Sequence, residues 1–250
     1  MKTLVALVLL MSSLSVFSYG QSMSAKDIIK KMNDNAFGGR LKSEMKMTIV
    51  RPSWTRTMEM KSWADGDDYS LILITSPARE KGISYLKVNR EMWNFQPSID
   101  RVIKMPPSMM MQSWMGSDFK NDDLVRQSST EKDYTQKLLG KENVSGRECY
   151  KIELIPNEDA PVVWGKILIW VDTKEYLQLK TEFYDEDDDL VNTMLGENIT
   201  KLGGRTLPAK MVLIPADEDG HKTIMEYKSL EFDAKFDESF FSKRNMMRVR

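Results

Sequence analysis

Most of the chain alternates between apolar and polar residues with a period of two, the pattern of a β-strand with one buried face. Met45, Met47 and Ile49, for example, alternate with Lys46 and Thr48. Because no long helical segment separates these runs, they predict a meandering antiparallel sheet. The predicted strands fall at 41–49, 58–61, 69–74, 83–88, 91–95, 100–104, 134–139, 148–155, 165–171, 177–184, 190–199, 207–214 and 222–232.

Two segments show helical patterns instead. Ser24 is placed to cap a helix with Asp27 at its third position, and the residues 35–39 end that helix. One apolar stripe runs along it: Ile28, Ile29 and Met32. The second helical segment is Asn121 to Arg126. These two helices are the available covers for the sheet.

A single sheet of this length must curl, split or be covered, and two short helices cannot fill a wide barrel. We therefore predict a mainly β fold of the α+β class. Its core is an incomplete antiparallel β-barrel or curved sheet, with an N-terminal helix and a helical or loop lid over an apolar cavity.

The first twenty residues have the features of a secretory signal peptide. Lys2 supplies a positive start, Leu4 to Leu14 form an apolar run, and Ser18 and Gly20 are small residues at the cleavage positions. We expect cleavage near Gly20, export to the periplasm and one mature domain over 21–250. A retained N-terminal anchor is the alternative.

Charge and cysteine content exclude other classes of protein. The formal net charge is −1 and no basic block is present, which argues against a nucleic-acid partner. Cys149 is the single cysteine, so an intrachain disulfide is excluded. Because its neighbours alternate as in a strand, Cys149 is predicted to be a small buried apolar residue.

Candidate catalytic and metal-binding residues are few. His221 is the single histidine and follows a turn sequence, so it is interpreted as a solvated turn residue. The acidic run 185–189 resembles part of a calcium loop. However, Leu190 stands where such a loop needs Gly, and Gly196 where it needs Glu. The run is predicted to be a hairpin tip, and we expect no metal, no cofactor and no catalysis.

In the segment 101–119 a Pro-Pro break is followed by four Met and one Trp, without strand or helix periodicity. This segment is predicted to be a movable flap over an apolar cavity, although a loop tucked over the protein's own core is the alternative. Met side chains fit ligands of variable shape. The predicted ligand-binding residues are Met47, Met58, Met60, Trp63, Trp93, Phe95, Met105, Met109, Met110, Met111, Trp114 and Met115.

Several short segments together resemble a known family. A helix of the form Asp27-Ile28-Ile29-Lys30-Lys31-Met32 precedes the meander, and four further segments follow it. These are SPAREKG at 76–82, WNFQP at 93–97, RVIK at 101–104 and GSDF at 116–119. The chain resembles the LolA-like outer-membrane lipoprotein-sorting proteins over nearly all its mature length. It is more similar to the branch found near membrane exporters than to the archetypal lipoprotein carrier.

This resemblance implies a function as well as a fold. It implies a periplasmic carrier that shields the acyl chains of a lipoprotein or lipid and delivers them toward the outer membrane or an exporter. The implied partners are an inner-membrane transporter or an outer-membrane receptor, and we expect a monomer. The archetypal carrier ties its lid with an arginine, for which Arg40 and Arg51 are both candidates here. A sensor module that binds a partner protein and responds to lipid is the alternative function, and a carboxylate-based hydrolase ranks below it.

Overall fold

The computed structural model describes residues 23–126, 129–158, 160 and 162–249, so the predicted signal peptide lies outside the described residues. Thirteen strands form one antiparallel sheet within them. In chain order they are β1 (Arg40–Arg51), β2 (Trp54–Asp65), β3 (Tyr69–Ser76), β4 (Ser84–Val88), β5 (Glu91–Gln96), β6 (Arg101–Lys104), β7 (Tyr134–Val144), β8 (Arg147–Pro156), β9 (Lys166–Asp172), β10 (Gln178–Tyr184), β11 (Leu190–Leu202), β12 (Arg205–Pro215) and β13 (Lys222–Phe232).

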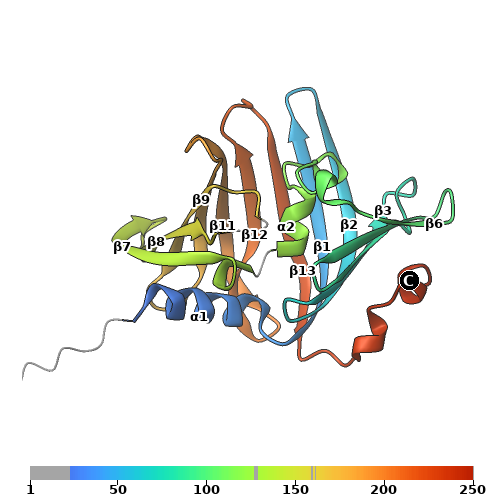
Figure 1. Cartoon of the computed structure of the whole chain (residues 1–250), viewed down its shortest axis with the longest axis horizontal. Coiled ribbons are helices and arrows are strands. Elements are labelled where there is room, and N and C mark those ends of the chain that lie inside the picture. Colours follow the sequence, from blue (N-terminus) through green and yellow to red (C-terminus); the bar gives the residue numbers. More distant parts are fainter. Residues whose placement is uncertain (1–22, 127–128, 159, 161, 250) are drawn as a thin grey trace, which may run out of the picture.

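The sheet is built from two meanders that meet at its centre, where β1 pairs with β13. From there β1 to β6 run outward to one edge, and β13 back to β7 run outward to the other. No pairing joins β6 to β7 in the described part of the chain, so the sheet stays open. Figure 1 shows it as a curved wall. The predicted incomplete, curved antiparallel sheet is confirmed.

The N-terminal helix α1 (Ala25–Phe37) covers one half of the concave face. Its cap forms as predicted, since the Asp27 backbone N–H donates to Ser24 Oγ over 3.1 Å. The buried stripe of Ile28, Ile29 and Met32 packs on inward side chains of β8 and β9. Figure 1 shows α1 lying across the lower end of that half of the sheet.

The other half of the concave face is covered by the segment between β6 and β7. We call residues 105–119 the flap; it contains the 3-10 turns η1 (Pro107–Met109) and η2 (Trp114–Gly116). The short helix α2 (Asn121–Arg126) and the turn η3 (Ser129–Glu131) follow it and lead toward β7. In Figure 1, α2 lies in front of the centre of the sheet, between its two halves.

The convex face is covered by a C-terminal tail, residues 234–249, that the sequence patterns did not predict. It contains η4 (Glu238–Phe240) and α3 (Lys243–Met246). Phe240 and Phe241 lie 5.4 Å, between ring centroids, from Trp63 and Tyr69 respectively. The Ser84 hydroxyl donates to the buried backbone carbonyl of Met246 over 2.7 Å. The tail therefore closes a second apolar layer outside the sheet.

Two smaller expectations are confirmed. Cys149 is fully buried on β8, and burial raises the pKa of its thiol to about 11, which makes it unreactive at neutral pH. The acidic run 185–189 joins β10 to β11 as a hairpin tip, in which the Asp187 and Asp189 backbone N–H groups donate to Asp185 Oδ1. Among the described residues, no helix is long and apolar enough to span a bilayer.

Candidate functional site

A cavity of about 230 Å³ lies between the concave face of the sheet, α1 and the flap. Its apolar lining comes from α1, from the flap and from strands in both halves of the sheet. Its lining residues are Met32, Phe37, Leu41, Ser43, Met45, Met60, Ser62, Ala64, Ser70, Ile72, Trp114, Phe119, Asp122, Asp123, Thr130, Tyr134, Trp164, Ile167, Ile169, Gln178, Thr181, Phe183, Asn192, Met194, Met211, Leu213, Met225 and Tyr227.

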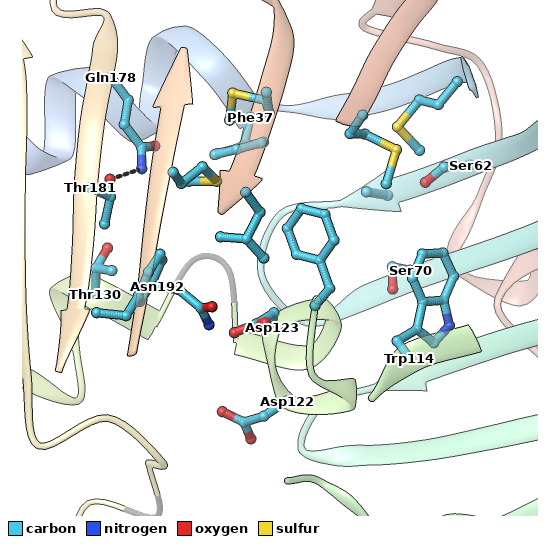
Figure 2. A pocket seen from close by; sticks show the side chains of 18 of the residues that line it. Phe37, Ser62, Ser70, Trp114, Asp122, Asp123, Thr130, Gln178, Thr181 and Asn192 are labelled. Atoms are coloured by element: carbon cyan, nitrogen blue, oxygen red, sulfur yellow. Dashed lines mark hydrogen bonds between the residues drawn. The ribbon is translucent and has the colours of Figure 1, made fainter. Parts of the chain in front are cut away.

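The cavity exists because small side chains occupy inward positions on three adjacent strands. Ser43 on β1 stands opposite Ser62 on β2, and Ala64 on β2 stands opposite Ser70 on β3. All four line the cavity. A large side chain at an inward position fills the space over the sheet, so a row of small ones leaves that space open. Ser62 and Ser70 face Trp114 from the flap in Figure 2.

Methionine pairs form the adjoining wall. The register places Met45 opposite Met60 and Met47 opposite Met58, and Met225 lies opposite Met47 on β13. Met47, Met58 and Met60 are buried in one cluster under the flap. The predicted common face of the early Met residues is therefore confirmed. Flexible thioether side chains let such a wall adapt to different apolar shapes.

The aromatic side chain of Trp114 packs the flap against the sheet. Trp114 is only 1% exposed, and its ring meets the Tyr85 ring edge-on at 5.7 Å between centroids. Met109 and Met110 pack against the same cluster as Trp114. Met111 points outward and is 52% exposed. Both sequence-based interpretations therefore describe part of the flap. It covers the core through Trp114, and it also forms one wall of the cavity.

A polar latch fastens the flap to the centre of the sheet. Arg51, at the end of β1, donates from its two terminal nitrogens to the Asp118 carboxylate over 2.8 and 3.2 Å. It also donates to the Gly116 carbonyl over 3.3 Å. Thr223 on β13 donates from its hydroxyl to Asp118 over 2.6 Å. The Arg51 and Asp118 side chains are only 12% and 5% exposed, so this ion pair is poorly screened by solvent.

A second arginine supports the same segment. Arg56 on β2 donates to the backbone carbonyl of Met115, and it pairs with Glu80 over 3.4 Å. Met115 has a positive φ of 54°, an unusual conformation for a non-glycine residue. Arg40, the other arginine considered from sequence, pairs with Asp65 in a more exposed position and does not contact the flap. The arginines that hold the flap are therefore Arg51 and Arg56.

The opposite end of the cavity is polar. Gln178 and Thr181 come from β10, Asn192 from β11 and Asp123 from α2. Gln178 donates to the Thr181 hydroxyl over 2.6 Å. Asp123 accepts from the Lys120 backbone N–H over 2.7 Å and from the Trp164 indole N–H over 3.4 Å. Figure 2 shows the carboxamide of Asn192 directed toward the Asp123 carboxylate.

Burial raises the pKa of Asp123 to about 6, against its ordinary value of 3.8, while the Lys120 and Trp164 donors oppose that rise. The native state therefore holds this proton more tightly than the unfolded state does. Since the native state binds more protons between about pH 4 and about pH 6, the free energy of unfolding should fall as pH rises through that window.

Asp123→Asn is expected to remove this contribution and to make the protein more stable than the wild type at pH 7, because the amide oxygen can keep the same acceptor role without the charge. Urea unfolding of both proteins across the window would measure the difference. Parallel pH profiles for the two proteins would contradict the assignment. Asp122→Asn, the neighbouring carboxyl on α2, is the comparison that shows whether the effect belongs to Asp123.

The twelve predicted ligand-binding residues fall into four groups. Met60 and Trp114 line the cavity, and Met47, Met58, Met105, Met109, Met110 and Met115 pack in the cluster beneath or within the flap. Met111 is largely exposed. Trp63, Trp93 and Phe95 do not line the cavity, because they lie on the convex face under the C-terminal tail.

The placement of those three aromatic residues corrects the expectation. On β2, Trp63 is an odd number of positions from Met60, so the two side chains point to opposite faces of the sheet. Trp93 and Phe95 pack in the same convex cluster as Trp63. Sequence reasoning missed the small and polar lining residues. Their signal was a polar side chain at an inward position of an alternating strand, as at Ser43, Ser62 and Asn192.

One group among the described residues brings three potential metal ligands together: Asp118, Glu218 and His221, whose ligand atoms all lie within 4.8 Å of one another. Asp118 is already neutralised by the Arg51 guanidinium, and that fixed positive charge disfavours a cation beside it. His221 pairs with Glu218 in the β12–β13 turn and is only partly exposed, so it is less solvated than expected. Asp118 is better described as part of the flap latch.

Comparisons with known proteins agree with this architecture. The model of a protein family whose description reads "uncharacterized protein" matches residues 66–248. A DUF1329 family protein from Desulfovibrio piger superimposes with a TM-score of 0.82 at 25% identity, over 89% of this chain and 97% of that one. No curated protein matches the sequence.

Two further crystal structures share the fold. One is described as an outer membrane lipoprotein-sorting protein domain from Vibrio parahaemolyticus, with a TM-score of 0.80 at 22% identity over 90% of this chain and 98% of that one. The other is a LolA superfamily protein from Nitrosomonas europaea, with a TM-score of 0.77 at 24% identity over 89% and 99%. The near-complete coverage of these chains means that the likeness extends over the whole fold.

Proposed function

We propose that this chain, which belongs to the family whose model matches residues 66–248 and shares the fold of LolA-superfamily proteins, is an exported carrier of acyl chains. In this proposal it takes up the acyl chains of a lipoprotein or lipid and delivers them across the periplasm, toward the outer membrane or an exporter. The observation that carries the proposal is an apolar cavity covered by a Met-rich flap that is held shut by polar contacts.

Affinity in such a carrier comes from apolar surface that leaves water, at about 0.8 kcal/mol for each buried CH₂. Longer chains should therefore bind more tightly until the cavity is full. The cavity of about 230 Å³ is smaller than typical ligand pockets of about 300–1,000 Å³. A long acyl chain would therefore require the flap to move outward, and the Met wall to repack around the ligand.

The latch gives a physical basis for controlled release. Arg51, Asp118 and Thr223 join the flap to β1 and β13, so opening the flap breaks a buried ion pair and a hydroxyl hydrogen bond. A partner that competes for Asp118 or for the flap carbonyls would lower the cost of opening. We propose that an inner-membrane transporter or an outer-membrane receptor supplies this competition, and that the carrier acts as a monomer without catalysis.

Native mass spectrometry of the mature protein purified from the periplasm tests the proposal, followed by organic extraction and lipid identification. A bound phospholipid or acylated peptide would support a carrier and identify its cargo class. A protein that is empty, and that also fails to take up a fluorescent acyl probe, would contradict it. That second outcome would favour a sensor module that acts through a partner protein.

A further inference from the structure

Two polar side chains that line the cavity, Asn192 and Ser43, are almost completely shielded from bulk solvent. Asn192 is 4% exposed, and its carboxamide makes no hydrogen bond to any residue that the structure describes. Ser43 is 3% exposed, and its hydroxyl likewise makes no hydrogen bond within the described part of the chain. Burying a polar group without a hydrogen bond is unfavourable, so native proteins keep few such groups. A group of this kind that opens onto a cavity indicates a ligand or water that satisfies it.

The charge of the lining restricts that ligand. Among the lining residues two carboxylates occur, Asp122 and Asp123, and no Lys, Arg or His. A buried anion needs a positive partner or several donors, and here it would instead meet a carboxylate close to Asn192. Figure 2 shows Asp123 and Asn192 at the same end of the cavity. An anionic group is therefore disfavoured at the polar end of the cavity, where Asn192 offers its hydrogen bonds.

We propose that the cavity binds an uncharged lipid segment that carries a hydrogen-bonding group, such as a hydroxyl, ester or amide, and that Asn192 recognises this group. The Met wall of β1 and β2 then covers the hydrocarbon part. This inference rests on the proposed carrier function and specifies its ligand class. A carboxamide both donates and accepts, so it can satisfy a hydroxyl or an ester equally well. The raised pKa of Asp123 adds a second donor below about pH 6.

The test measures displacement of N-phenyl-1-naphthylamine, a neutral fluorescent probe, by four ligands of equal chain length at about pH 8. These are dodecanol, monododecanoylglycerol, sodium dodecanoate and dodecylamine. The two uncharged ligands should displace the probe at concentrations at least about tenfold lower than the carboxylate does, because the carboxylate must be buried beside Asp123. Equal or tighter binding of the carboxylate or of the amine would overturn the inference.

Asn192→Leu is the matching variant, since it keeps the volume and removes the hydrogen bonds. Uncharged ligands should bind it about tenfold more weakly, whereas the affinity for the probe itself should stay unchanged. Because Asn192 has no described partner to lose, unfolding in urea should show no loss of stability. Thr193→Leu is the control, since the neighbouring residue points to the other face of β11. An unchanged affinity for the two uncharged ligands in Asn192→Leu would overturn the role of this residue.

The two proposals fail in different ways. If neither the probe nor any of the four ligands binds, the carrier function and this inference are both wrong. If all of them bind but the carboxylate and the alcohol are equivalent, the carrier function survives and only the uncharged-ligand inference is wrong.

Discussion

Ser62→Trp should abolish acyl-chain binding while leaving the sheet folded. Ser62 is one of the small inward residues that leave the cavity open, and an indole at that position would fill much of the 230 Å³. Excluding three or four methylene groups removes about 3 kcal/mol of apolar burial, which weakens binding about a hundredfold. Titration with a fluorescent fatty-acyl probe measures the loss.

The neighbouring residue supplies the control for this variant. Lys61→Trp introduces the same side chain one position earlier on β2, where it points to the convex face. It should bind the probe as the wild type does. Overpacking at Ser62 could cost about 1–3 kcal/mol, so urea unfolding of both variants must accompany the titration. Equal probe affinity in Ser62→Trp and Lys61→Trp would show that the cavity does not hold the ligand.

Arg51→Met should release the flap. This change leaves the Asp118 carboxylate buried beside the sheet without its guanidinium partner, and breaking a buried ion pair in this way costs about 3–5 kcal/mol. Because the latch joins only the flap to β1 and β13, the cost should appear as local opening. Hydrogen exchange of the amides at 105–119 should accelerate strongly, whereas exchange at 148–155 in β8 should change little.

A second substitution separates the lost interaction from a general loss of structure. Arg51→Met combined with Asp118→Leu replaces the ion pair with apolar side chains and should restore much of the protection, because no buried charge remains. Arg40→Met removes a more exposed pair with Asp65 and should shift stability by less than about 1 kcal/mol. If Arg51→Met accelerated hydrogen exchange uniformly over the sheet, the latch would stabilise the whole fold and not the closed flap alone.

The local features of this protein could be predicted from sequence because their causes are local. Alternating patterns placed the strands, since a strand with one buried face has a period of two. Ser24 and Asp27 marked the start of α1 because a helix cap uses residues three positions apart. Met45, Met47, Met58 and Met60 were assigned to one face, and the register confirms that assignment.

The sequence could not decide which of the two faces of the sheet a strand residue belongs to in space. Trp63, Trp93 and Phe95 were assigned to the cavity because they are large and apolar, yet they pack beneath Phe241 of the C-terminal tail. An apolar residue is buried equally well on either face once both faces are covered. The tail that covers the convex face is short and irregular, so it has no hydrophobic periodicity from which it could be predicted.

By itself, therefore, the sequence determined the class of the fold, the course of the strands and the existence of a Met-rich flap. Only the tertiary structure decided where a cavity remains and what it can bind. Ser43 and Ser62 lie 19 positions apart in the chain but opposite each other in the sheet, and Arg51 meets Asp118 only when the flap folds back over β1. The volume of the cavity and the position of the buried ion pair both depend on which side chains, distant in the sequence, lie next to one another. Those contacts are fixed by tertiary packing and not by the local sequence pattern.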